Sequence, residues 1–253
     1  QGWQIKDKQL FYWNSKSISG NVIDWVIKVL GYPDKSSAIE YLNTIDAPFH
    51  TFSDQEPKTV SKINQSLGLF YHKNLDEYST KWWNNRGVYD LKKWGVGFCK
   101  DFSGLGPTSV IPYYEKGELV QIKHRLHEKK DSLRYISEQE GLGVWVYNID
   151  NLNKDMTIIV EGEIKAMVVE EMLEIPAIGI PSFNVLPDRY IEKINLCNKL
   201  IICLDPDVNL KKVSWIKKIK NFKEINSLPD KIDDLLVSSV QWKRNLKRII
   251  NSL

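Results

Sequence analysis

The feature that most constrains the fold is the alternation of apolar runs and amphipathic segments after residue 150. Apolar periodicity predicts strands at 157–161, 176–180, 199–204 and about 222–226. It predicts helices at 163–173, 187–195, 210–220 and 238–252. Strands that alternate with helices form a parallel sheet with helices on both faces. We therefore predict a doubly wound α/β domain over residues 151–253.

Carboxylates follow two of these predicted strands. Glu161 ends the first strand, and Asp205 and Asp207 follow the apolar run 200–204. Because the carboxyl ends of parallel strands meet at one edge of the sheet, these three acids are expected to converge. Converging carboxylates repel one another unless a cation lies between them, and oxygen ligands without His or Cys suit Mg²⁺ or Mn²⁺. Gly162 removes side-chain bulk where a phosphate or metal would approach the backbone.

The first 150 residues divide into three regions. Residues 1–45 predict strands at 3–5 and 10–13, a helix that closes at Gly31, and a second helix with Ser37 as its N-cap. Residues 46–62 have no apolar period and are predicted to be a linker. Residues 63–150 predict an α+β region with a helix at 76–87, a β-hairpin at 108–126 and a strand at 133–137.

Composition narrows the class of protein. A chain of 253 residues with 42% hydrophobic residues can bury a real core, and a net charge of +3 excludes an indiscriminate polycation. The three cysteines form no CxxC pair, so we expect free thiols in a reducing cytoplasm. No apolar run approaches the roughly 18–20 residues of a membrane span, and residues 1–9 show no signal-peptide pattern. The chain begins without methionine, as a piece of a longer protein would.

Several motifs resemble one known family. The stretches EGEIKA (161–166), IPAIGIPS (175–182) and LDPD (204–207) resemble the TOPRIM domain of DNA primases, topoisomerases and related nucleases. The stretch 82–98, with its Arg-Gly pair, is similar to the segment before the catalytic core of bacterial and phage primases. Residues 111–126 resemble the basic primase stretch beside the active site, and residues 19–42 resemble the end of the primase zinc-binding domain.

The resemblance implies a DNA primase that synthesises short RNA primers on a single-stranded DNA template. It implies that nucleoside triphosphates are substrates and that a replicative helicase is a partner. Asp205 and Asp207 would bind Mg²⁺ (or Mn²⁺) that carries the triphosphate. Glu161 would complete the coordination or act as a general base on the attacking hydroxyl. The distance of the sequence from the cellular pattern suggests a phage, plasmid or other mobile element.

Region 1–45 departs from that family. Primase zinc ribbons hold zinc with three or four Cys or His ligands, and this region contains neither residue type, so no zinc is expected. The region is either a metal-free remnant or a fragment that begins after a first ligand pair and has lost the second. Trp3, Phe11, Tyr12 and Trp13 would replace the metal by packing, or alternatively stack on template bases.

The acidic motifs depart as well. The family places Asp four residues after the glutamate of Glu-Gly, where this chain has Lys165. In a later acidic motif Lys231 replaces an aspartate, although Asp233 and Asp234 remain, and Asp233 is our fourth candidate metal ligand. We predict that the lysines compensate, with an ammonium group neutralising phosphate charge in place of a missing ion. The alternative is that Lys165 lies on the solvated side of its helix.

Basic residues supply the candidate nucleic-acid contacts. Lys123 and Arg125 share one face of the predicted hairpin. By resemblance, Arg86, Arg125 and Arg134 fall where primases contact template and nucleotide. His124 and His127 are predicted to be surface residues. The run Lys243, Arg244, Lys247 and Arg248 is predicted to be a solvated helix face.

Two other functions use the same residues. A TOPRIM nuclease would hydrolyse phosphodiesters with these acids, although the chain lacks the GxxxxGK[ST] motif of the ATPases that accompany many such nucleases. A catalytically weakened module would bind single-stranded DNA or a helicase without chemistry. The absent zinc ligands and the two lysine replacements favour that alternative.

Overall fold

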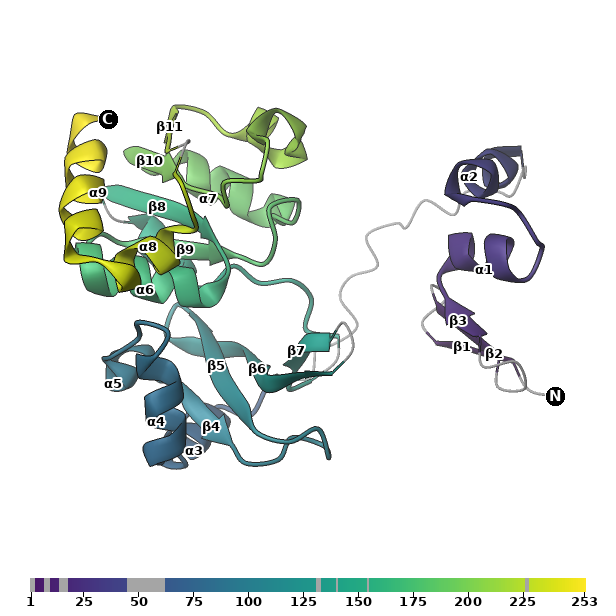
Figure 1. Ribbon diagram of the computed structural model, residues 1–253, viewed down its shortest axis with the longest axis horizontal. Coiled ribbons are helices and arrows are strands. Elements are labelled where there is room, and N and C mark those ends of the chain that lie inside the picture. The colour runs from purple at the N-terminus through teal and green to yellow at the C-terminus, as the bar shows by residue number, and fades with distance from the viewer. Residues whose placement is uncertain are drawn as a thin grey trace. The chain divides into compact units, whose positions relative to one another are not determined.

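The computed structural model describes residues 3–6, 10–13, 18–44, 62–130, 133–139, 141–153, 155–225 and 228–253. The chain divides into two compact units, Gln1–Lys58 and Thr59–Leu253, shown in Figure 1. Most of the predicted linker lies outside the described residues. The predicted boundary near residue 150 crosses the hydrophobic core of the second unit, in which Trp83 and Ile111 pack with Ile158.

The N-terminal unit contains a small antiparallel sheet and two helices. Its sheet has the order β1-β2-β3 and is built from β1 Trp3–Lys6, β2 Leu10–Trp13 and β3 Ile18–Gly20. The helices α1 Val22–Lys28 and α2 Lys35–Thr44 pack together. The predicted strands at 3–5 and 10–13 are confirmed. The side chains of the aromatic cluster at residues 3 and 11–13 lie outside the described residues.

The N-cap predicted for α2 is wrong. The helix begins at Lys35, and Ser37 lies inside its first turn. The carboxylate of Asp34 accepts a hydrogen bond from the Ser37 backbone N–H at 2.9 Å, which is the contact that an N-cap makes. Asp34 therefore performs the capping role, and the serine hydroxyl adds a bond to the same carboxylate.

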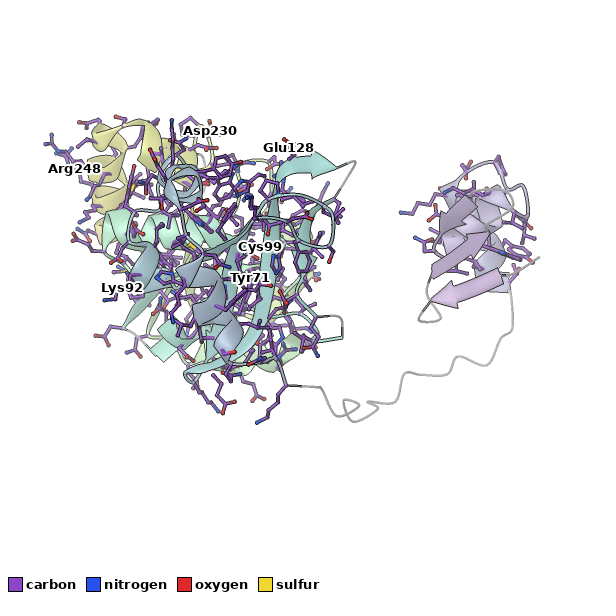
Figure 2. The ribbon with its side chains drawn as sticks, turned by 90° about the horizontal axis from the view of Figure 1, so that it is seen from below. Tyr71, Lys92, Cys99, Glu128, Asp230 and Arg248 are labelled. Carbon is purple, nitrogen blue, oxygen red and sulfur yellow. The ribbon has the colours of Figure 1, made fainter. Side chains whose placement is uncertain are left out.

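The first part of the C-terminal unit is a four-stranded antiparallel sheet with three helices. The sheet has the order β4-β5-β6-β7 and is built from β4 Gly97–Cys99, β5 Thr108–Glu115, β6 Glu118–Lys130 and β7 Leu133–Ser137. The helices are α3 Ser66–Lys73, α4 Glu77–Asn84 and α5 Leu91–Trp94. The predicted hairpin, helix 76–87 and strand 133–137 are all present. Tyr71 of α3 and Cys99 of β4 lie close together (Figure 2).

The second part is the parallel sheet that the sequence predicts. Its four strands have the order β11-β10-β8-β9, and every neighbouring pair is parallel. They are β8 Met156–Glu161, β9 Ala177–Ile180, β10 Lys199–Ile202 and β11 Phe222–Glu224. A 3₁₀ helix at Ile149–Asn153 precedes β8.

Helices and 3₁₀ turns surround this sheet. The α-helices are α6 Glu163–Leu173, α7 Ile191–Asn195, α8 Ile232–Ser238 and α9 Val240–Ser252. The 3₁₀ segments are Asp188–Tyr190, Leu210–Lys212 and Ser214–Lys218. The first of them joins directly to α7, so the predicted helix 187–195 is present in two parts.

The helix predicted at 210–220 is wrong. Val213 is extended (φ −83°, ψ 113°) and separates two short 3₁₀ segments. Val213 and Trp215 are both buried, yet residues two apart point to different sides of an α-helix. Splitting the helix lets both side chains reach the core.

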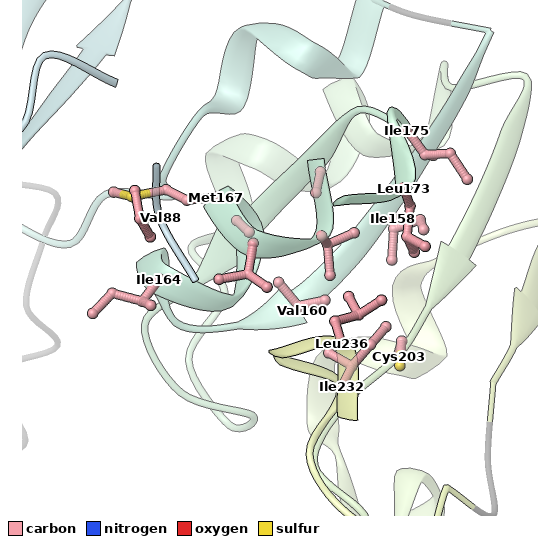
Figure 3. Packing of buried hydrophobic residues seen from close by; sticks show 14 of the residues in the cluster. Val88, Ile158, Val160, Ile164, Met167, Leu173, Ile175, Cys203, Ile232 and Leu236 are labelled. Atoms are coloured by element: carbon pink, nitrogen blue, oxygen red, sulfur yellow. The ribbon is translucent and has the colours of Figure 1, made fainter. Parts of the chain in front are cut away.

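Both faces of the parallel sheet are covered because its strands are apolar on both sides. Ile158 and Val160 of β8 face the core shared with α6, α8 and α9, whereas Ile159 faces the other core beside α7. Figure 3 shows Val160 beside Ile232 and Leu236 of α8. This alternation is the two-residue period of a strand.

Because all four strands are parallel, their carboxyl ends lie together at one edge of the sheet.

In the described part of the chain, none of the helices is both long enough and apolar enough to cross a membrane.

Candidate active site

A cleft of about 600 Å³ lies where the carboxyl edge of the parallel sheet meets the β-hairpin. Its walls come from the turn after α4, from β6 and β7, and from the end of β8 with the first turn of α6. The segment after β10 and the start of α8 complete the lining. The charged lining residues are Arg86, Lys123, Arg125, Arg134, Lys165 and Lys231, with Glu161, Glu163, Asp205, Asp233 and Asp234. The cleft therefore brings together most of the residues that the sequence singles out.

Two of the predicted strand-end acids meet in this cleft. Glu161 is the last residue of β8, and Asp205 follows β10 by three residues. Burial raises the pKa of Glu161, and the charges of Asp205 and Asp207 raise it further, while Lys165 lowers it. Asp207 is exposed and lies outside the described lining of the cleft, although its charge reaches Glu161.

Gly162 lines the cleft and leaves open space beside its backbone. Its φ of +92° lies in the region that favours glycine, and a Cβ built there would meet nothing within 4 Å. As the N-cap of α6 it has no side chain to accept hydrogen bonds from the first helical turn. The N-terminus of α6, with its partial positive charge, therefore faces open space.

Two lysines hold Asp205. Lys165 Nζ lies 2.6 Å from Asp205 Oδ1, and Lys231 Nζ lies 3.6 Å from Asp205 Oδ2. The side chain of Lys165 is only 13% exposed, so the alternative that it lies on the solvated side of its helix is wrong. Lys231 is the N-cap residue of α8 and its side chain is half exposed.

The donor set at Asp205 does not fit a divalent ion in this arrangement. Both of its carboxylate oxygens have an ammonium partner. Among the described residues, no three Asp, Glu, His or Cys side chains form a group able to hold a metal ion. A hard divalent ion needs several oxygens directed at one point, and both oxygens of Asp205 that the sequence assigned to it are paired with lysines instead.

Asp233 adds a buried acid without a full set of partners. Its Oδ1 is buried and has no hydrogen-bond partner among the described residues. Burial raises the pKa of Asp233. The positive charge of Lys165 lowers this pKa, and the negative charge of Asp234 raises it. A buried carboxylate oxygen without a donor is costly, so this atom indicates that a cation or donor approaches it when the site is occupied.

Three arginines form a ridge on the hairpin side of the cleft. Arg86 comes from the turn after α4, Arg125 from β6 and Arg134 from β7. Burial lowers the pKa of Arg86, and the charges of Arg125 and Arg134 lower it further. Like charges held this close are unfavourable without an anion, so the arginine ridge fits phosphate groups.

Local contacts position the arginine ridge. The guanidinium of Arg86 lies 4.2 Å from the centre of the Trp82 ring, and Arg125 donates a hydrogen bond of 2.6 Å to the Tyr135 hydroxyl. Gly87 turns the chain with φ +80°, and a Cβ there would lie 2.4 Å from Cγ2 of Val237. Glycine at 87 thus lets Arg86 reach the cleft by packing the chain directly on α8.

Lys123 contributes to the cleft through an ion pair. Its Nζ lies 2.8 Å from Oε1 of Glu163, which also accepts a hydrogen bond from the Tyr113 hydroxyl. Burial pushes the pKa of Glu163 upward, but Lys123 and Tyr113 outweigh it and leave that pKa below its usual value. Lys123 is therefore a residue that fixes the hairpin to α6, and Arg125 is the more available phosphate contact on the same strand.

The prediction that His124 and His127 are surface residues is wrong for His124, and His127 is half-buried. His124 is fully buried, hydrogen-bonded to Thr108 and to Glu138, and stacked on Phe102. His127 stacks on Trp82 at 4.6 Å, and its burial, with the charges of Arg86 and Arg125, lowers its pKa to about 4. These hairpin histidines look solvated in sequence because the aromatic residues that cover them, Phe102 and Trp82, are distant along the chain.

The basic run of α9 remains on the outside of the C-terminal unit. Arg244 and Arg248 are exposed, and Lys247 forms an ion pair with Glu174. Figure 2 shows Arg248 at the outer surface of the unit. The opposite side of α9 buries Leu246 and Ile250. This arrangement agrees with the predicted solvated face.

The site also contains residues that sequence reasoning did not select. Glu163, Tyr135 and Asp234 line the cleft, and Trp82 and Tyr113 support its walls. Glu163 was detectable as a second acid beside the strand-end glutamate. The aromatic residues carried no comparable signal, because tryptophan and tyrosine usually mark a core.

The fold has counterparts among solved structures. No family model matches the chain, and no curated protein sequence matches it. The Aquifex aeolicus primase structure with zinc-binding and RNA polymerase domains aligns with 97% of this chain and 73% of its own, at 15% identity and a TM-score of 0.60. The RNA polymerase domain of Mycobacterium tuberculosis DnaG, with double-stranded DNA carrying an overhang, aligns with 72% of this chain and 77% of its own, at 16% identity and 0.58.

A third structure, a DnaG primase catalytic domain bound to single-stranded DNA, covers 74% of this chain and 78% of its own, at 16% identity and 0.57. The structural neighbours of this chain are thus DnaG-type primases, and the predicted primase-type fold is confirmed. The absence of zinc stays a prediction, which rests on the lack of cysteine and histidine in residues 1–45.

Proposed function

We propose that this chain is a DnaG-like primase that binds single-stranded DNA and joins ribonucleotides into a short RNA primer. One observation carries the proposal: the arginine ridge and the strand-end acids line the same cleft. The fold of DnaG-type primases supports it, and one of those neighbours is bound to single-stranded DNA. Replication of a phage, plasmid or other mobile element is part of the same proposal.

The reaction joins the 3′-hydroxyl of one nucleotide to the α-phosphate of the next and releases pyrophosphate. The arginine ridge holds template or nucleotide phosphates by charge-assisted hydrogen bonds. Glu161, whose pKa is raised by burial and by Asp205, suits proton transfer from the attacking hydroxyl. Asp205 positions Lys165 and Lys231 toward the phosphates.

Mg²⁺ or Mn²⁺ is the cofactor that the sequence predicts for this chemistry. The donors of the described cleft do not fit such an ion at Asp205, because both oxygens of that residue face lysines. The roles proposed for the cleft therefore belong to its side chains and to the N-terminus of α6.

A second candidate is a binding module without catalysis. The observation that favours it is the engagement of Asp205 by two lysines, which removes a carboxylate from the metal-dependent chemistry that the sequence predicts. Such a module would still use the arginine ridge to hold single-stranded DNA or would join a helicase for assembly.

Template-directed incorporation of labelled ribonucleotides separates these functions. The full chain is incubated with single-stranded DNA, all four nucleoside triphosphates, and magnesium or manganese. We expect ribonucleotide products from the parent and at least about a hundredfold less from Asp205→Ala, since the phosphate-binding side chains lose their anchor. Asp188→Ala, an exposed acid outside the cleft lining, is the matched control and should retain activity.

Other outcomes identify the alternatives. Binding of the template without product from either chain would contradict the primase proposal and favour the binding module. Cleavage of the template, lost in Asp205→Ala, would indicate a nuclease.

A further inference from the structure

The Asp205 carboxylate contacts ammonium groups from two different elements. Lys165 comes from the first turn of α6, and Lys231 comes from the residue that precedes α8. Their Nζ atoms lie 2.6 Å from Oδ1 and 3.6 Å from Oδ2. Each oxygen therefore has its own cation, so an incoming ion has to displace a lysine to reach Asp205.

The two lysines carry the charge that one divalent ion would bring. Glu161, Asp205 and Asp233 all line this part of the cleft, and the charges of Lys165 and Lys231 act on Glu161. Acids this close need positive charge between them. Since the lysine ammoniums supply that charge, they compete with a divalent ion for the same carboxylates.

The lysines also have donors left for a ligand. A lysine ammonium has three N–H donors, and the ion pair with Asp205 does not use all of them. Lys165 is held in place by its burial, whereas half-exposed Lys231 lies at the rim. The open space at Gly162 and the N-terminus of α6 adjoin them in the lining of the cleft. Fixed ammonium groups beside a helix N-terminus suit a phosphate group.

We propose that Lys165 and Lys231, anchored by Asp205, are the resident cations of this cleft: they replace a divalent ion at Asp205 and bind polyphosphate directly. The identification of that polyphosphate as the triphosphate of a nucleotide rests on the proposed function. The resident-cation site itself follows from the two ion pairs and the cleft that contains them.

The first consequence concerns metal binding. Removing the lysines frees Asp205 beside Glu161 and Asp233, so the variant should bind cations better than the parent does. We expect Lys165→Met/Lys231→Met to bind Mn²⁺ at least about tenfold more tightly than the parent, because two competing charges are lost. Electron paramagnetic resonance titration of free Mn²⁺ measures this affinity without any enzymatic reaction.

The second consequence concerns phosphate. In buffer stripped of divalent cations by a chelating resin, the parent should bind inorganic triphosphate in a calorimetric titration. Each single variant, Lys165→Met and Lys231→Met, should lose about tenfold in affinity, the value of one charge-assisted hydrogen bond. Inorganic triphosphate has no base or sugar, so the titration reports the phosphate site alone.

Controls keep the two tests specific. Lys212→Met removes the same charge from an exposed position outside the cleft lining and should leave both affinities unchanged. The unfolding free energy of each variant is measured first. Lys231→Met changes a half-exposed side chain and is expected to fold even if Lys165→Met does not.

The proposal is overturned if the parent binds triphosphate only with a divalent ion present. It is equally overturned if the lysine variants behave as Lys212→Met does, or if Mn²⁺ binding weakens when the lysines are removed. Primer synthesis is scored in a separate assay. A chain that binds triphosphate as expected but makes no primer would refute the proposed function and leave the resident-cation site standing.

Discussion

At the scale of single residues, Glu163 links the two sheets of the C-terminal unit. It is the first residue of α6, just after the carboxyl end of β8, and its carboxylate accepts hydrogen bonds from Tyr113 of β5 and Lys123 of β6. Only 4% of Glu163 is exposed. A charge so deeply buried is stable only while its partners remain, so this residue fixes the hairpin against the cleft.

Glu163→Gln is expected to destabilise the fold. Breaking a buried ion pair from one side should cost about 3 kcal/mol of unfolding free energy, because the Lys123 ammonium loses its counter-charge. The folded-state pKa of Glu163 is below its usual value of 4.5, so its stabilisation is present above that pH and lost as the pH falls through the folded pKa. Urea denaturation from neutral pH downward measures the difference between variant and parent.

A double-mutant cycle provides the control for this prediction. Glu163→Gln combined with Lys123→Met removes both charges, so the double variant should recover part of the loss. Additive losses, or a difference that stays constant through acid pH, would show that the two charges are not coupled.

The candidate site was partly predictable at this scale. Glu161 and Asp205 could be assigned from sequence because a strand end positions its last residues at the sheet edge. The burial of Glu163 could not, since it depends on Tyr113, which is 50 positions away in the chain. The partners of Lys165 and Lys231 were equally hidden, because an acid replaced by a lysine looks solvated until the opposing carboxylate is placed.

At the scale of elements, the Arg86-Gly87 turn, which follows α4, packs against two helices of the parallel sheet, α6 and α8. A Cβ at Gly87 would lie 2.4 Å from Cγ2 of Val237 and 3.2 Å from Cε of Met172. The turn thus packs directly on α8 and α6. Because Arg86 precedes this contact, the position of the arginine ridge depends on it.

Gly87→Ala is expected to destabilise the fold by about 2–4 kcal/mol, the sum of a strained positive φ and a steric clash. Gly104→Ala is the matched control: its φ of +75° is similar, but a Cβ there meets nothing within 4 Å. That control should lose only about 1 kcal/mol. Equal losses at the two positions in thermal or urea unfolding would contradict the close packing of this turn on α8.

The elements themselves were largely predictable where one period dominates. The four parallel strands and α6 have strict patterns, and all five are present close to their predicted bounds. The segment 210–220 failed because its buried residues do not share one helical face. Helix α8 was not predicted, because its seven residues are too few for the apolar period of Ile232, Leu235 and Leu236 to stand out.

At the scale of the whole molecule, residues from both sheets of the C-terminal unit line the same cleft. The antiparallel sheet contributes the arginine ridge, and the parallel sheet contributes acids and lysines at its carboxyl edge. A shared hydrophobic core holds the two sheets together. Template and nucleotide are therefore expected to bind at the same place, between β6 and α6.

Hydrogen exchange of the full chain, with and without single-stranded DNA and ATP, tests that claim most directly. We predict slower exchange in β6, Glu118–Lys130, and in the first turn of α6 when both ligands are present. We predict no change in α9, Val240–Ser252, whose exposed basic residues lie outside the lining of the cleft. Protection confined to α9, with β6 and α6 unaffected, would contradict the account.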